Sequence, residues 1–271
     1  MTDPSAPLLF FDSGIGGLSV FDKVRAALPN APMVYAADYA GLPYGEKSET
    51  EIAARVPALL GRLVERYRPR LITIACNTAC TIALGHVRAA LEVPVVGTVP
   101  AIKPAALATT TGVFGLLGTK ATIRQPYVDR LEEEFGAGKT LLRHASSELV
   151  LAAEAKMRGE APDVHIFREA VSGLIGQNGG DQLDTMILGC THFPLVQAEL
   201  AAAAHNLGHG HEIQFVDGSD GIARRIAYLT DGQYWPNAPT PGTFVTTGAI
   251  EEMEPYRPKL ATAGFTEIVA L

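Results

Sequence analysis

The sequence predicts an α/β fold with two similar α/β halves, each built on a mostly parallel sheet. Short apolar runs alternate with segments whose apolar residues recur at helical spacing, an order typical of parallel strands covered by helices. Two separate passages, LITIAC (71–76) and TMILGC (185–190), each carry a buried strand up to a cysteine. This similarity indicates two related units.

The first third of the chain contains strand signals that alternate with helix signals. Ser48 and Glu51 fit a capping box, in which each side chain satisfies an orphan amide at a helix start. Pro57 lies inside the helix that follows, so we expect a kink or a short break there. The expected strands are 8–11, 32–38, 71–75 and 93–99, and the expected helices are 18–28, 49–67 and 78–91.

The rest of the chain repeats the alternation and then changes to a loop rich in Pro, Gly and Asn. The expected strands are 112–119, 185–189 and the start of 213–229, with late edge strands at 244–248 and 266–271. The expected helices are 122–135, 194–204, the end of 213–229, and most of 146–178 with an interruption at 159–162.

Composition excludes several classes of partner. A formal net charge of −7 argues against a nucleic-acid binder, which would show a basic face. The most apolar stretch is broken by prolines, a lysine and threonines, so no membrane span is expected. No basic region precedes the N-terminal apolar run, and three cysteines without regular spacing do not form a disulfide framework. We expect a reduced, cytoplasmic protein.

Polar and reactive residues follow the expected strands. Ligands of open α/β folds bind beyond the carboxyl ends of the strands, so these residues are expected to gather in one place. They are Asp12, Ser13, Gly14, Asp38, Cys76, Asn77, Thr78, Thr119, Cys190, Thr191, His192 and Asp217.

Two of the three cysteines stand directly before predicted helices. The positive end of a helix dipole stabilises a thiolate, so Cys76 and Cys190 are candidate reactive groups. Cys80 lies inside the helix after Cys76 among apolar residues, and we interpret it as part of the core.

Two thiols permit three kinds of chemistry. The cysteine and histidine spacing does not fit a zinc site, and strand-end helices favour anions over cations. A redox pair would need the sulfurs to meet, and C-x-x-C is absent. The third kind is a pair of acid–base groups on opposite faces of one carbon, where one thiolate removes a proton and the other thiol returns one. Two like groups suit racemisation because their pKa values start matched.

Three further features of the sequence are candidate functional groups. The turn DSGIGG (12–17) could cradle an anion, but it is a poor match to a dinucleotide fingerprint. His192, two residues after Cys190, could tune or relay protons. The histidines at 205, 209 and 211 lie in a polar loop without a carboxylate partner, and we interpret them as solvated.

Six motifs carry a family resemblance. They are FDSGIGGLSVF, YAADYAGLPYGEKS, ITIACNTA, VPVVGTVPAIKPA, GLLGTKATI and ILGCTHFPL. Together they resemble, in order from about residue 8 to residue 217, the bacterial glutamate racemases of the aspartate/glutamate racemase superfamily.

The resemblance implies a proton transfer at Cα that interconverts L- and D-glutamate without cofactor or metal. It implies that Cys76 is the base for D-glutamate, assisted by Asp12, and that Cys190 is the base for L-glutamate, assisted by Glu154 and His192. It implies a substrate-binding set of Asp12, Ser13, Tyr44, Gly45, Asn77, Thr78, Thr119, Thr122, Thr191 and His192. D-Glutamate in such bacteria goes to peptidoglycan.

The resemblance also implies two α/β domains that face each other across a central cleft. We expect the first domain at 1–98 and 210–271, carrying Cys76, and the second at 99–209, carrying Cys190. We expect a homodimer.

Other functions share parts of this pattern. A sister enzyme, such as an aspartate or hydantoin racemase or a maleate isomerase, would keep both thiols, although PYGEKS and GCTHFPL favour glutamate. A non-catalytic protein that binds an acidic amino acid would be expected to lose a thiol. A nucleotide-dependent enzyme is disfavoured by the poor glycine fingerprint.

Overall fold

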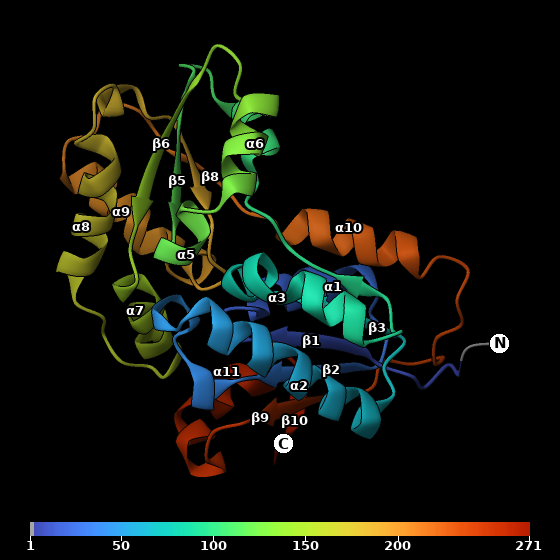
Figure 1. Ribbon diagram of the computed structural model, residues 1–271. Coiled ribbons are helices and arrows are strands. Elements are labelled where there is room, and N and C mark those ends of the chain that lie inside the picture. Colours follow the sequence, from blue (N-terminus) through green and yellow to red (C-terminus); the bar gives the residue numbers. More distant parts are fainter. Residues whose placement is uncertain (1–2) are drawn as a thin grey trace. The chain divides into compact units, whose positions relative to one another are not determined.

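The computed structural model describes residues 3–271 and divides into two compact units (Figure 1). The first unit comprises residues 3–98, 157–159 and 219–271, and the second comprises 99–156 and 160–218. The domain limits expected from the sequence stay a prediction. The chain leaves the second unit after Gly218, because strand β8 (Gln214–Val216) still pairs with β7 (Thr185–Leu188).

The sheet of the first unit has six strands in the order β10-β9-β2-β1-β3-β4, and every pair is parallel. The strands are β1 (Leu8–Asp12), β2 (Met33–Ala37), β3 (Leu71–Ile74), β4 (Val95–Val96), β9 (Gly242–Thr246) and β10 (Phe265–Ala270). A parallel sheet was predicted, and it is confirmed. One detail is wrong: β9 is not an edge strand, because it lies between β2 and β10 and buries Phe244 and Val245.

Both faces of this sheet are apolar, since successive strand residues point to opposite sides. Leu9 and Phe11 of β1 pack into a cluster with residues of helices α2 and α3. Phe10 points to the opposite face, where the centroid of its ring lies 5.2 Å from the ring centroid of Phe21 in α1. The helices of this unit are α1 (Leu18–Ala27), α2 (Glu49–Tyr67), α3 (Asn77–Ala90), α10 (Ser219–Leu229) and α11 (Arg257–Thr262).

Helix α2 begins as predicted and then differs from the prediction. The Ser48 hydroxyl accepts a hydrogen bond from the amide of Glu51 at 3.2 Å, which confirms the cap. Of the expected kink or short break at Pro57, the break is wrong, because the helix continues through this residue, and the kink stays a prediction. Buried residues on both sides of the proline, including Val56 and Leu60, pack on the sheet and outweigh one missing backbone hydrogen bond.

The sheet of the second unit has four parallel strands in the order β6-β5-β7-β8. Strand β5 (Val113–Gly118) was predicted, whereas β6 (Thr140–Ala145) was missed. Its residues TLLRHA are only partly buried and show neither a long apolar run nor a clean alternation, because β6 lies at the edge of the sheet.

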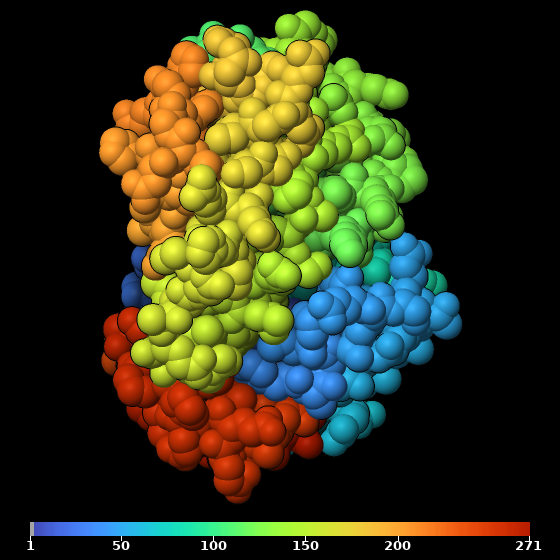
Figure 2. Space-filling view, turned by 90° about the vertical axis from the view of Figure 1, so that its left-hand side faces the viewer, coloured from blue at the N-terminus to red at the C-terminus, as the bar shows by residue number. Residues whose placement is uncertain are grey.

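Helices cover both faces of the second sheet. Residues of α4 and α6 share an apolar cluster with Phe114 of β5. Helix α8 contacts β5 and β6, and its atoms are among the yellow ones in Figure 2. The expected helix 122–135 is two helices, because Pro126 starts a new one. The helices are α4 (Ile102–Ala108), α5 (Lys120–Ile123), α6 (Pro126–Phe135), α7 (Glu148–Met157), α8 (Val164–Ile175) and α9 (Gln197–Asn206).

In the described part of the chain, residues 3–271, five short 3-10 helices connect these elements. They are Tyr39–Gly41, Tyr44–Glu46, Gly180–Gln182, Phe193–Val196 and Ile250–Tyr256. Within residues 3–271, none of the helices has the length and apolar character needed to cross a membrane.

Asp184 clamps the start of the second sheet. Its carboxylate accepts hydrogen bonds from the amides of Thr110 and Thr111 at 2.7 and 2.9 Å and from the Thr110 hydroxyl at 2.8 Å. Burial alone would raise the pKa of Asp184, but hydrogen bonds from Thr109, Thr110 and Thr111 outweigh it and hold the pKa below its ordinary value. The carboxylate therefore stabilises the loop that leads into β5.

We expect Asp184→Asn to lower the free energy of unfolding at neutral pH by about 1–3 kcal/mol, because charge-assisted hydrogen bonds are lost. A depressed pKa contributes stability above the unfolded pKa of about 3.9 and loses it as pH falls through the folded value. The deficit should therefore shrink below about pH 4. Urea unfolding at several pH values measures this, with exposed Asp181→Asn as the control. Equal stability of the two variants at pH 7 would contradict the assignment.

Candidate active site

Parallel pairing brings two predicted site residues of the first unit to one edge of the sheet. Strands β1 and β3 are neighbours, with Phe11 opposite Ile74. Asp12 ends β1 and is fully buried, and Cys76 follows β3 by two residues with 5% of its surface exposed. The carboxyl ends of the strands therefore place a carboxyl and a thiol in the same region of this unit.

Cys76 caps helix α3. Its sulfur accepts a hydrogen bond from the amide of Ala79 at 3.5 Å and lies 3.7 Å from Oγ of Ser13, to which the thiol can donate. An amide donor and the positive end of a helix both stabilise a thiolate. The predicted position of Cys76 directly before a helix is confirmed, and the arrangement can serve proton abstraction.

The glycine-rich turn after β1 is held by a hydrogen bond within the turn and by one from Tyr35 of β2. The amide of Gly14 donates to Oδ1 of Asp12 at 3.0 Å, and the Tyr35 hydroxyl donates to the carbonyl of Gly14 at 2.8 Å. A Cβ at Gly17 would come within 2.7 Å of the Tyr35 hydroxyl oxygen, so only glycine fits. The turn therefore presents the side chain of Ser13 to Cys76.

Four other predicted residues of this unit lie in the loops and helices that follow β2 and β3. Asn77 and Thr78 are the first two residues of α3, and both are buried. Tyr44 is buried in the apolar cluster that also contains Cys76, and Gly45 follows it in the same short 3-10 helix.

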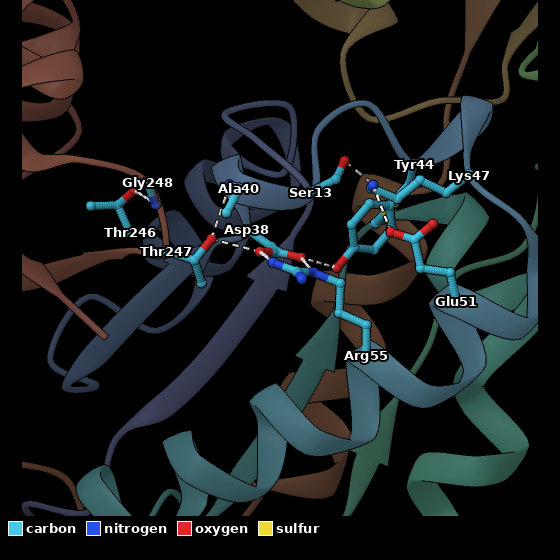
Figure 3. Close-up of polar contacts among 11 residues, drawn as sticks. Ser13, Asp38, Ala40, Tyr44, Lys47, Glu51, Arg55, Thr246, Thr247 and Gly248 are labelled. Carbon is cyan, nitrogen blue, oxygen red and sulfur yellow. Dashed lines mark hydrogen bonds and ion pairs between the residues drawn. The ribbon is translucent and has the colours of Figure 1, made fainter.

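Sequence reasoning missed a polar network around Asp38 (Figure 3). Asp38, at the carboxyl end of β2, accepts hydrogen bonds from Tyr44, Arg55 and Thr247. The strand-end position of Asp38 was a signal. Arg55 lies on α2, and Thr247 lies more than 190 residues further along the sequence, so no local pattern connects them.

In the second unit the structure brings together Cys190, His192 and Glu154. Nδ1 of His192 lies 3.9 Å from the sulfur of Cys190, and its Nε2 lies 2.7 Å from Oε1 of Glu154. His192 and Glu154 are each 1% exposed. Burial alone would lower the pKa of His192, but hydrogen bonds with Cys190 and Glu154 and the Glu154 charge raise it well above its ordinary value. An imidazolium at this place can stabilise a thiolate on Cys190.

One expectation about Cys190 is wrong. Cys190 does not directly precede an α-helix, because a 3-10 helix, Phe193–Val196, comes first and α9 begins at Gln197. A 3-10 turn this short adds little dipole, so the polar group placed beside Cys190 is the His192 side chain rather than a helix end.

Two threonines stand at the carboxyl end of β5, next to β7. Thr119 caps α5 by accepting the amide hydrogen of Thr122 at 3.2 Å, and their hydroxyl oxygens lie 3.1 Å apart. Leu117 of β5 pairs with Leu188 of β7, so this end lies beside the segment with Cys190. Thr191 is buried in that segment.

The remaining cysteine has no part in either group. The sulfur of Cys80 accepts a hydrogen bond from the amide of Thr98 at 3.1 Å and lies 3.0 Å from the carbonyl oxygen of Ile74. Burial raises the pKa of its thiol to about 12. The interpretation of Cys80 as core is confirmed.

The histidine cluster differs in part from its interpretation as solvated. His205 is exposed, but His209 is half-buried, with its Nε2 2.6 Å from the carbonyl oxygen of Leu183. All three histidines line an open hollow of about 830 Å³ in the second unit. Among residues 3–271, no group of three or more His, Cys, Asp or Glu side chains could hold a metal ion.

The chain is similar to known racemases in sequence. The profile of the Asp/Glu/Hydantoin racemase family matches residues 17–227. A glutamate racemase of Sphingopyxis alaskensis is 61% identical over 98% of this chain and 97% of its own, and one of Haemophilus influenzae is 42% identical over 83% and 80%.

Solved structures also resemble the chain. The crystal structure of Escherichia coli glutamate racemase in complex with L-glutamate and the activator UDP-MurNAc-Ala matches with a TM-score of 0.87 and 38% identity, covering 98% of both chains. Glutamate racemase from Thermus thermophilus, in complex with β-chloro-D-alanine, matches at 0.75 and 26% identity over 100% of this chain and 98% of its own. On the family profile and these identities, the chain belongs to the Asp/Glu/Hydantoin racemase family.

Proposed function

We propose that this chain is a glutamate racemase that interconverts L- and D-glutamate by moving a proton at Cα between two cysteines. The observation that carries the proposal is the pair of buried strand-end thiols, Cys76 and Cys190, each beside a group that stabilises a thiolate. The 61% identity to a glutamate racemase along nearly the whole chain favours glutamate as the substrate.

The reaction uses one thiolate and one thiol, and it involves no oxidation or reduction. With D-glutamate, the Cys76 thiolate takes the proton from Cα, and the electron pair stays on the substrate as a carbanion. The Cys190 thiol then gives its proton to the opposite face, which forms L-glutamate and leaves a thiolate on Cys190. The reverse direction starts from a Cys190 thiolate and a Cys76 thiol.

Neighbouring groups of each unit support this use of the thiols. An ordinary cysteine, with a pKa near ~8.5, is only a few per cent thiolate at neutral pH. The α3 end favours the anion at Cys76, and the His192 imidazolium favours it at Cys190. Asp12 assists on the Cys76 side, and Glu154 assists through His192.

Hydroxyl and amide groups around the thiols suit an amino acid that carries two carboxylates and one ammonium group. We propose that the substrate is held by Asp12, Ser13, Tyr44, Gly45, Asn77, Thr78, Thr119, Thr122, Thr191 and His192. The proposed reaction calls for no cofactor, because protein side chains supply both the base and the acid.

The proposed product is D-glutamate for peptidoglycan. A homodimer and a cytoplasmic location stay predictions. A related activity, racemisation of aspartate or of hydantoins, would use the same thiols. Binding of an acidic amino acid without turnover is less well supported, because both thiols are present together with the His192–Glu154 pair.

We expect the purified chain to racemise L- and D-glutamate without added cofactor and, in heavy water, to place deuterium at Cα of the product. Circular dichroism of the amino acid and mass spectrometry measure both results. Aspartate and hydantoins serve as competing substrates. A requirement for pyridoxal phosphate or a metal, or faster turnover of aspartate or a hydantoin, would overturn the proposal.

Cys76→Ser and Cys190→Ser should each reduce kcat/KM by about 10³-fold or more in both directions, since each direction uses one thiolate and one thiol. The overall equilibrium constant between enantiomers is one, so kcat/KM must fall equally for both. Cys80→Ser is the control, and it should keep turnover within a few-fold. Near-normal activity of either strand-end variant would transfer the role to another residue.

Glu154→Gln should shift the alkaline limit of activity to lower pH. The Glu154 charge helps to keep His192 protonated, so its loss lowers the pKa of the imidazole and the imidazolium disappears earlier as pH rises. The pH dependence of kcat/KM tests this, with exposed His165→Gln as the control. An unchanged alkaline limb would remove Glu154 from the proposed mechanism.

A further inference from the structure

We infer that Asp38 is a positioning residue for the proposed racemisation, because one buried carboxylate holds Tyr44, Arg55 and Thr247 and thereby sets the turn that contains Tyr44 and Gly45. The inference rests on the proposed function, in which that turn contacts the substrate. Neither Asp38 nor its partners Arg55 and Thr247 belongs to the catalytic and substrate-binding residues proposed above.

Both oxygens of Asp38 are fully used. Oδ2 accepts the hydroxyl of Tyr44 and Nε of Arg55, each at 2.5 Å. Oδ1 accepts a guanidinium NH₂ of Arg55 and the hydroxyl of Thr247, each at 2.6 Å. A carboxylate offers about four acceptor positions, and the four donors occupy them. The two parallel bonds from Arg55 also fix the plane of the carboxylate.

The charges in this network are balanced inside the first unit. The side chain of Asp38 is fully buried, and Arg55 supplies the opposite charge from helix α2. Burial alone would raise the pKa of Asp38, but hydrogen bonds from Arg55, Thr247 and Tyr44 outweigh it and lower the pKa. Burial and the Asp38 charge raise the pKa of Tyr44, so its phenol remains a donor. Asp38 therefore stays an anion with a hydrogen-bonded tyrosine attached.

The backbone of the loop after β2 packs closely against the Asp38 carboxylate. A Cβ at Gly41 would collide with the Asp38 carboxylate, the Tyr44 ring and the Arg55 guanidinium. The amide of Gly41 donates to the carbonyl of Asp38 at 2.9 Å. The path of residues 39–44 is thus set by the side chain at its start, and the sequence D-Y-A-G-L-P-Y permits that path only because residue 41 is glycine.

Thr247, which directly follows β9, connects the Asp38 network to the C-terminal part of the chain. Its hydroxyl donates to Asp38 and accepts the amide hydrogen of Ala40 at 3.1 Å (Figure 3). The pairing of β2 with β9, which puts Ala37 opposite Thr246, brings Thr247 to this place. One hydroxyl therefore connects the carboxylate with the loop that the carboxylate organises.

Through Tyr44, the Asp38 network extends to the surroundings of Cys76, one of the two proposed bases. Tyr44 packs in the same apolar cluster as Cys76 and Ala79. A movement of Tyr44 would therefore change both the wall near Cys76 and the turn with Gly45. A displacement of about 1 Å in a positioning group can cost on the order of 10²-fold in rate.

The test separates positioning from mere stability by a conservative series at Thr247, which contacts Asp38 from outside the loop. We expect Thr247→Val to raise KM for both enantiomers about 5-fold or more, because the hydroxyl is lost and Asp38 and Ala40 lose their link. Thr247→Ser keeps the hydroxyl and should return KM to within about twofold of the wild type. Asp38→Asn should raise KM more than Thr247→Val, because an amide cannot accept four donors.

Two comparisons complete the experiment. The effect of Thr247→Val should be much smaller in a Tyr44→Phe background, since coupled residues give non-additive effects. Arg55→Lys, which keeps the charge but not the fork, should raise KM, whereas Arg62→Lys on the exposed side of the same helix should not. Urea unfolding of every variant accompanies the kinetics.

Failure of this inference is distinct from failure of the proposed function. A wild-type chain that does not racemise glutamate refutes the function. A wild-type chain that does so, while Thr247→Val keeps KM within twofold, refutes the positioning role. Equal KM values for Thr247→Ser and Thr247→Val, or additive effects of Thr247→Val and Tyr44→Phe, also refute it. If Asp38→Asn does not fold, the Thr247 series alone decides.

Discussion

Parallel strand pairing is the constraint on which both candidate groups depend. In a parallel sheet every strand ends at the same edge, so residues far apart in sequence become neighbours there. In the first unit this register places Asp12, Asp38 and the segment with Cys76 after three adjacent strands, β1, β2 and β3. In the second unit it places Thr119 beside the segment that carries Cys190. The apolar faces of the sheets and the helices that cover them maintain this register.

The two thiols resemble each other in sequence but have different surroundings. The sulfur of Cys76 accepts a hydrogen bond from the amide of Ala79 in the first turn of α3 and lies 3.7 Å from the Ser13 hydroxyl oxygen. Cys190 lies 3.9 Å from Nδ1 of His192, whose Nε2 lies 2.7 Å from the buried carboxylate of Glu154. The equilibrium constant of one between enantiomers fixes the ratio of the two kcat/KM values but not the strengths of the two bases, so the two thiols do not need matched environments. A dipole and a paired positive charge are two physical routes to a stabilised thiolate.

Three buried carboxylates, those of Asp38, Glu154 and Asp184, are stabilised by neighbouring groups. Asp38 is paired with Arg55, and Glu154 with His192, and Asp184 is surrounded by threonine hydroxyls and amides. An unpaired buried charge costs several kcal/mol, on the order of the margin that keeps a domain folded. Asp38 bonds the proposed site residue Tyr44, and the other pair consists of the proposed site residues Glu154 and His192, so the groups that compensate buried charge lie where the chemistry is proposed.

The sequence by itself determined the α/β class, most strands and helices, the cap at Ser48 and the two strand-end cysteines, because each of these is written in residues close together along the chain. It did not predict β6, whose edge position leaves no clear periodicity, or the interior place of β9. Only the tertiary structure decided how Asp38, Arg55 and Thr247 meet, and that a 3-10 helix rather than an α-helix follows Cys190. Such contacts depend on strand order and register, which join distant segments through interactions that no local pattern encodes.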